Sequence, residues 1–125
     1  MDFVPFQLVK KYIEKGFTLC EGNTYGYFNK DGLFYSLRSY IEGFGSLGDK
    51  SEFIPAPFYE QIFEWLRNNK NIYIDNESWG PNHYHSIIKK YDNKKVHKHI
   101  YLKYEKSFLE SQFQSLCYII DNNLI

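Results

Sequence analysis

The chain has 125 residues, the length of one ordinary domain, and 43% of them are hydrophobic, which is enough to build a core. Its 15 basic and 15 acidic residues balance to zero charge, which argues against general nucleic-acid binding but leaves room for a local basic patch. Aromatic residues make up 20%, more than a domain of this size can hide, so we expect some tyrosines at the surface. We expect a single domain spanning residues 1–125.

Two features bear on the cellular compartment. No apolar run approaches the length of a membrane span, and the N-terminus lacks the basic and apolar regions of a signal peptide. Cys20 and Cys117 lie far apart without motif neighbours, and Cys117 falls on an apolar helical stripe, which predicts a buried thiol. We therefore expect a cytoplasmic protein with reduced thiols and no membrane association.

The N-terminal part of the chain predicts a helix and then a hairpin. Apolar residues recur at helical spacing between Pro5 and Lys15, and Gly16 suits the C-cap. An aromatic strand at 25–28, a turn at 29–32 and a second strand at 33–37 follow.

The next segment, 38–54, predicts a loop because three glycines lie close together among small polar residues. It contains GFGSLG, which matches the dinucleotide fingerprint G-x-G-x-x-G. That fingerprint needs a preceding buried strand and a helix that starts at the glycines, and the sequence predicts neither here. We therefore interpret residues 41–48 as a flexible loop that could act as a lid.

The central stretch, 55–74, predicts a helix that runs directly into a strand. Pro57 suits the first helical turn, where its missing N–H loses no partner. The apolar stripe consists of Phe58, Ile62, Trp65 and Leu66, widened by Phe63. Trp65 is therefore expected to anchor the core. Ile72 and Ile74 then alternate with polar residues, which is the period of a strand.

Two further strands and a last helix complete the chain. Strands are predicted at 83–91 and 95–104, and Ser107 with Glu110 forms a capping box for a helix that ends near Asn122. The apolar stripe of this helix is Leu109, Phe113, Leu116, Cys117 and Ile120. The predicted fold is α+β, in the order helix, two strands, helix, three strands, helix. The last three strands form an antiparallel meander which, with the N-terminal hairpin, packs against the helices.

These elements resemble a family of small uncharacterised proteins from phages and prophages of Bacteroidetes. The resemblance is carried by Ala56-Pro57, then Trp65-Leu66-Arg67, then Ile72 and Ile74. The first helix with its Lys-Gly-Phe ending, the hairpin, the Trp79 turn and the last helix follow in the family's order, so most of the chain is covered. The segment 41–48 departs as an insertion, and the last helix begins with Phe108-Leu109-Glu110 instead of a run of Glu and Ala. The resemblance implies a phage accessory origin and a fold, but no catalytic chemistry.

Four histidines suggest a binding surface on the last two strands. If 92–94 is a three-residue loop, Tyr91 opposes Lys95 and the odd-numbered residues share one face. That face would carry His83, His85, Lys89, Lys95, His97, His99, Tyr101 and Lys103. The other face would carry Tyr84, Ile88, Val96, Ile100 and Leu102, a sensible core, so we prefer this register. A two-residue loop would put the histidine pairs on opposite faces.

The His/Lys/Tyr face offers charge, hydrogen bonds and ring stacking, which suit a phosphate or a nucleotide base. The alternative is an ordinary solvated sheet face, partly neutralised by Asp75 and Glu77. Trp79 lies in a Gly-Pro turn, where it is either an exposed binding residue or a ring folded over a core edge. The candidate ligand-binding residues are therefore His83, His85, His97, His99, Tyr101, Lys103 and Trp79.

Metal binding and catalysis are disfavoured by spacing. Matched residues along a strand lie ~6.5 Å apart, and no Cys or carboxylate stands at a diagnostic spacing from the His-x-His pairs. No nucleophile elbow or metalloprotease helix is present, so we expect no catalytic residues, no metal and no cofactor.

Three functions follow in order of preference. The first is a phage-encoded accessory protein that sequesters a small anionic ligand, such as a nucleotide signal of antiviral defence. The second is an interaction module that inhibits a host protein through exposed aromatics, and the third is a small phosphodiesterase-type enzyme. An aromatic-rich sheet is compatible with a homodimer, although the sequence does not establish the oligomeric state.

Overall fold

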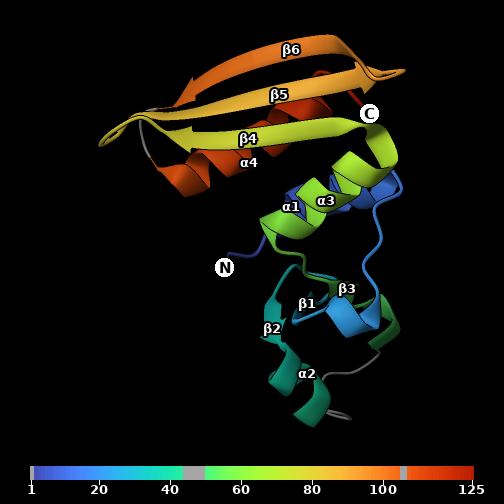
Figure 1. Ribbon diagram of the computed structural model, residues 1–125. Coiled ribbons are helices and arrows are strands. Elements are labelled where there is room, and N and C mark those ends of the chain that lie inside the picture. Colours follow the sequence, from blue (N-terminus) through green and yellow to red (C-terminus); the bar gives the residue numbers. More distant parts are fainter. Residues whose placement is uncertain (1, 44–49, 105–106) are drawn as a thin grey trace. The chain divides into compact units, whose positions relative to one another are not determined.

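A computed structural model describes residues 2–43, 50–104 and 107–125 (Figure 1). Its fold class is α+β, as the sequence predicts, with helices and two three-stranded antiparallel sheets. The chain divides into two compact units, one formed by Phe3–Phe58 and the other by Tyr59–Ile125 together with Asp2. None of the helices in the described ranges is long and apolar enough to cross a membrane.

The N-terminal unit begins with α1 (Phe6–Glu14), which the sequence predicts closely. The expected hairpin is also present as β1 (Gly26–Phe28) and β2 (Phe34–Ser36), paired in antiparallel register. The turn between them depends on Asn29, whose side-chain oxygen accepts hydrogen bonds from the backbone of Asp31 and Leu33. Gly32 completes the turn with a φ of 86°, a left-handed conformation that favours glycine.

The segment 38–54 is not simply a loop, and the sequence prediction is wrong where the structure describes it. Helix α2 (Leu37–Glu42) is capped by the Ser36 side chain, and a 3-10 turn (η2, Lys50–Glu52) leads into β3 (Ile54–Pro55). β3 pairs with β1, which gives the strand order β2-β1-β3. Stacking of Tyr40 on Tyr27, with ring centroids 3.9 Å apart, ties α2 to the sheet and compensates for its short length. The glycine-rich segment expected to act as a lid falls largely at 44–49, outside the described residues.

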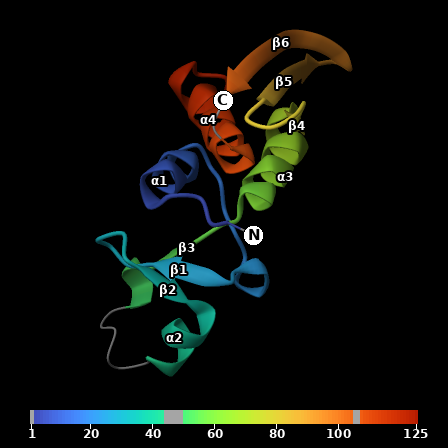
Figure 2. The ribbon, with the colours of Figure 1, turned by 90° about the vertical axis from the view of Figure 1, so that its left-hand side faces the viewer.

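The C-terminal unit consists of α3 (Tyr59–Lys70), β4 (Ile72–Ser78), β5 (Tyr84–Asp92), β6 (Lys95–Tyr104) and α4 (Phe108–Asp121). The strands form the predicted meander in the order β4-β5-β6. Helix α4 lies along one face of this sheet, as Figures 1 and 2 both show. Asn71 ends α3 with a φ of 55°, so the chain turns into β4 without an intervening loop.

The buried faces of the two helices differ from the predicted stripes. On α3 the buried residues include Tyr59 and Phe63, whereas Trp65 is only half-buried, with the Lys70 ammonium over its ring. The predicted role of Trp65 as a core anchor is therefore wrong.

On α4, Leu109 is 40% exposed and Cys117 is half-buried, so the prediction that both belong to the buried stripe is wrong. The buried face is Ser111, Ser115, Leu116 and Ile119. The physical reason is a polar network: the Asn76 side chain on β4 donates a 2.7 Å hydrogen bond to Ser86 on β5. The α4 serines face the same amide, which lets them be buried with their hydroxyls satisfied.

The β5–β6 register shows that the predicted three-residue loop is wrong. Asp92 pairs with Lys95, so Asn93 and Lys94 alone form the turn, with φ values of 49° and 67°. Both values match the two-residue hairpin turn whose twist suits paired strands. A bulge then adds His97 to β6. From Lys98 onward, odd-numbered residues of β6 therefore pair with odd-numbered residues of β5, as the sequence predicts. Val96 lies before the bulge, opposite Tyr91, and is 50% exposed, so its predicted place in the core is wrong.

Candidate functional site

The face of the β4–β5–β6 sheet that points away from α4 carries the candidate site. Ile88 on the α4 side is fully buried, and the residues beside it along β5 point to the opposite face because side chains alternate. On that face His85 lies directly between Glu77 of β4 and Lys103 of β6. The next two rows are Asp75, Ile87 and Tyr101, and then Tyr73, Lys89 and His99. We call this surface the open face.

Trp79 is the most exposed aromatic residue of the open face, and its ring is held from two directions. It lies over His85, with ring centroids 4.0 Å apart and an interplanar angle of 33°. Its indole Nε1 donates a 2.8 Å hydrogen bond to Glu77 Oε2. Even so, 63% of Trp79 is exposed. The indole is therefore fixed on one side and open on the other, which is the geometry of a stacking platform.

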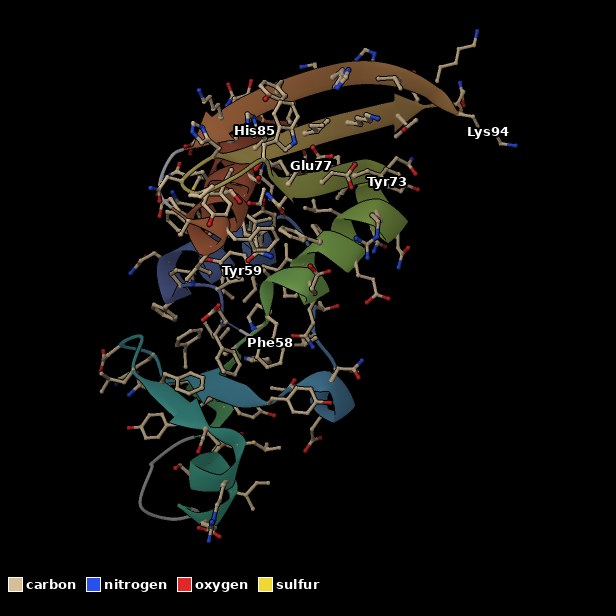
Figure 3. All side chains as sticks on the ribbon, turned by 60° about the vertical axis from the view of Figure 1, so that its left-hand side comes forward. Phe58, Tyr59, Tyr73, Glu77, His85 and Lys94 are labelled. Carbon is tan, nitrogen blue, oxygen red and sulfur yellow. The ribbon has the colours of Figure 1, made fainter. Side chains whose placement is uncertain are left out.

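His85 lies beneath this platform and is itself only 5% exposed. Its Nδ1 is hydrogen-bonded to the Tyr101 hydroxyl, and the two ring centroids lie 5.2 Å apart. Tyr101 is 49% exposed, so its ring continues the platform from β5 onto β6. The three rings form one cluster because His85 fills the space that would otherwise separate the two exposed aromatics. Figure 3 shows His85 and Glu77 near the same end of the sheet.

Charge on the open face is divided by strand. Asp75 and Glu77 lie on β4, whereas Lys89 lies on β5 and Lys103 lies on β6. Glu77 already accepts the indole hydrogen bond, which makes it a structural partner of Trp79. An anionic group would therefore be attracted to the β6 side of the platform and repelled from the β4 side.

The structure does not bring all of the predicted site residues together. His85, His99, Tyr101 and Lys103 share the open face, and Trp79 lies over it. His83 precedes β5 in the connecting turn, where its backbone oxygen accepts from Trp79 N at 2.8 Å, and its side chain is exposed. His97 lies in the bulge and is exposed. Neither residue is part of the ring cluster.

Sequence reasoning missed two parts of this surface. The first is the role of Glu77 as an anchor for Trp79, which a carboxylate two residues before an exposed Trp could have suggested. The second is a pocket of about 510 Å³ near the β5–β6 turn, lined by Asn71, Tyr73, Tyr91, Asn93 and Lys94. Its tyrosine rings meet edge to face with centroids 5.2 Å apart. They come from different strands, so only the register reveals the pair.

Among the residues that the structure describes, no group of three or more His, Cys, Asp or Glu could hold a metal ion. Comparison of the chain with protein-family models, curated proteins and solved structures finds no match.

Proposed function

We propose that the protein is a small non-enzymatic binding protein that holds a nucleotide-like ligand on the open face. The observation that carries this proposal is the Trp79 indole, which is 63% exposed although it is fixed by His85 and Glu77. A ring that is already immobile loses little side-chain entropy when a ligand stacks on it. A planar base would lie on the free side of Trp79 and extend toward Tyr101.

The neighbouring charges orient such a ligand. With a base on Trp79 and Tyr101, a phosphate group would lie toward Lys103 and His99 and away from the β4 carboxylates. Lysine supplies the charge for phosphate, and histidine and tyrosine supply hydrogen bonds. The resemblance to phage and prophage proteins suggests a setting for this binding: sequestration of a nucleotide signal used in antiviral defence.

The test is a thermal-shift screen with linear and cyclic nucleotides. A ligand at 100 times its Kd should stabilise the protein by about 2.7 kcal/mol. Trp79→Leu and His99→Ala should abolish or weaken the shift. His97→Ala is the matched control, since it removes another exposed histidine of β6 that lies four residues, or ~13 Å, from Tyr101. Recovered ligand should be chemically unchanged, and a hydrolysed ligand would favour an enzyme. No shift with any nucleotide would refute the proposal.

A second function, inhibition of a host protein, draws support from a different observation in the N-terminal unit. Apolar and aromatic side chains are exposed there at Tyr25 (55%), Leu33 (60%), Phe34 (45%) and Ile41 (59%). Aromatic residues are enriched in protein interfaces. This alternative predicts a stoichiometric host partner whose binding is lost with Leu33→Asp and unaffected by Trp79→Leu.

A further inference from the structure

The β5–β6 hairpin is strongly basic, although the whole chain is neutral. Residues 84–104 contain six lysines and a single acidic residue, Asp92, so the hairpin carries a formal charge of five positive units and the rest of the chain an equal negative charge. The six are Lys89, Lys90, Lys94, Lys95, Lys98 and Lys103. Lys90 and Lys98 pair on the face toward α4, where Lys90 Nζ donates a 2.6 Å hydrogen bond to the Leu124 backbone oxygen, so the other four are the lysines that a ligand on the open face would meet. Charge concentrated on one hairpin and interleaved with aromatic residues is the pattern expected where a protein follows a nucleic-acid backbone.

The open face carries a second group of aromatic rings toward the hairpin turn. We call this group the second station, and the cluster of Trp79, His85 and Tyr101 the first station. Tyr73 and Tyr91 meet edge to face at 5.2 Å and form one wall of the 510 Å³ pocket. Tyr73 is 43% exposed, so its ring is accessible to a base. Figure 3 shows Tyr73 and Lys94 toward the end of the sheet opposite to His85 and Glu77. Tyr91 lies four residues along β5 from the row of Tyr101, a distance of ~13 Å.

A basic pair separates the two aromatic stations. Lys89 and His99 lie opposite each other between the row of Tyr101 and the turn. A ligand that reached both stations would therefore pass its backbone over a lysine and a histidine. One mononucleotide is too short for this path, whereas a chain of about four nucleotides falls at the lower end of single-strand site sizes.

Lys94 is the residue that local structure explains least. It occupies the second position of the turn with a φ of 67°, where glycine is strongly favoured. A lysine in this position strains the turn, and Lys94 is one of the residues that line the pocket. A residue that breaks a local rule without a local gain points to a functional role.

We propose that the open face and the β5–β6 hairpin bind a short single-stranded nucleic acid, with bases stacked at both stations and lysines along its phosphates. This inference rests on the proposed function, because the Trp79 station is shared, and it names the ligand as an oligonucleotide. It agrees with the neutral charge of the whole chain, since the positive charge is local to one hairpin.

The experiment is fluorescence anisotropy with labelled 12-nucleotide dT and rU strands. With four phosphate contacts, the affinity should fall about 50-fold between 50 and 200 mM salt. Tyr73→Leu should weaken binding about tenfold or more through lost stacking. Two controls should change little: Tyr25→Leu, at a tyrosine of the N-terminal unit that is 55% exposed, and Lys11→Gln on α1. Comparison of the dT and rU strands shows which sugar the site prefers.

Lys94→Gly separates function from folding, because its two effects have opposite signs. Glycine relieves the left-handed turn, so the urea midpoint should rise. Loss of the ammonium should weaken oligonucleotide binding severalfold and reduce the salt dependence. A variant that is more stable and binds less tightly cannot have lost binding through misfolding.

The outcomes distinguish this inference from the proposed function. If mononucleotides bind and depend on Trp79, but the strands bind no tighter and Tyr73→Leu and Lys94→Gly behave like the wild type, the inference is overturned and the proposed function stands. If poly-glutamate competes as well as dT does, the hairpin is only a polyanion surface and the inference is also overturned. If neither strands nor mononucleotides bind, both fail.

Discussion

The Asn76 side chain connects the sheet to α4, and replacing it with aspartate should be strongly destabilising. Its Nδ2 lies 2.7 Å from Ser86 Oγ, 3.3 Å from Ser115 Oγ and 3.5 Å from Ser111 Oγ. All three hydroxyls donate elsewhere: Ser86 and Ser115 donate to the Ser111 backbone oxygen, and Ser111 donates to the Phe108 backbone oxygen. Around Asn76 the serine oxygens can therefore only accept.

Asn76→Asp keeps the shape of the side chain and replaces the donating amide with a second acceptor. The variant loses about two hydrogen bonds of ~1 kcal/mol each and leaves a poorly solvated carboxylate unsatisfied at a further ~1–3 kcal/mol. Because Asn76 is half-buried, we expect the lower part of this range, about 3 kcal/mol in the free energy of unfolding. The new carboxyl should have a raised pKa when folded, so the part of the loss that comes from its ionised form is absent below its unfolded pKa of about 4 and grows as the pH rises through the folded pKa.

The assay is urea unfolding followed by circular dichroism at pH 7 and pH 4.5. The matched control is Asp75→Asn, which makes the reverse exchange at the neighbouring exposed position of β4 and should change stability by less than about 0.5 kcal/mol. The reasoning is refuted if Asn76→Asp stays within about 1 kcal/mol of the wild type at pH 7. It is also refuted if acid gives the variant no relief relative to the wild type.

Three further predictions test the packing. Burial raises the pKa of Tyr59 to about 12, helped by Cys117, Asp2 and Glu110. The stability that comes from the protonated Tyr59 hydroxyl should be complete below pH 10 and lost as the pH rises toward 12. In urea unfolding across that window, the difference in free energy of unfolding between wild type and Tyr59→Phe should therefore change by about 2 kcal/mol. A difference that stays constant with pH would contradict this. Gly26→Ala would place a Cβ 2.5 Å from the Phe34 ring, so we expect a loss of about 1 kcal/mol in thermal unfolding, whereas Gly22→Ala, with open space around it, should be neutral; equal effects would be inconsistent with the packing. Ser107→Ala removes the α4 cap that accepts from Glu110 N at 3.0 Å and should cost about 1 kcal/mol in urea unfolding, while Ser107→Asp should retain most of the stability; a neutral Ser107→Ala would show that the cap is dispensable.

Local sequence signals predicted most of the C-terminal unit. The alternation in β4 and β6, the capping box of α4 and the meander are all present because each depends on residues close in sequence. The α4 stripe could not be predicted in the same way. Ser111 and Ser115 count as polar in any periodicity, and they are buried only because Asn76 faces them from another element.

The candidate site was predictable in composition but only partly in arrangement. The sequence pointed to Trp79 and to the His and Tyr residues of the last two strands, and parity placed His85 with Tyr101 and Lys103. A two-residue turn alone would have separated them, and the bulge at His97 restores the parity. The bulge has no sequence signature here, so the prediction of a three-residue loop reached the right face for Tyr101 and the wrong one for Val96.

The most direct test of nucleotide binding on the open face uses the fluorescence of Trp79. The chain contains two tryptophans, so Trp65→Phe leaves Trp79 as the sole reporter, and Trp79→Phe leaves Trp65 as its matched control. Titration with nucleotides should quench the Trp79 reporter saturably as a base stacks on the indole, and it should leave the Trp65 reporter unchanged. Equal responses from both reporters, or no saturable response from Trp79, would contradict the account.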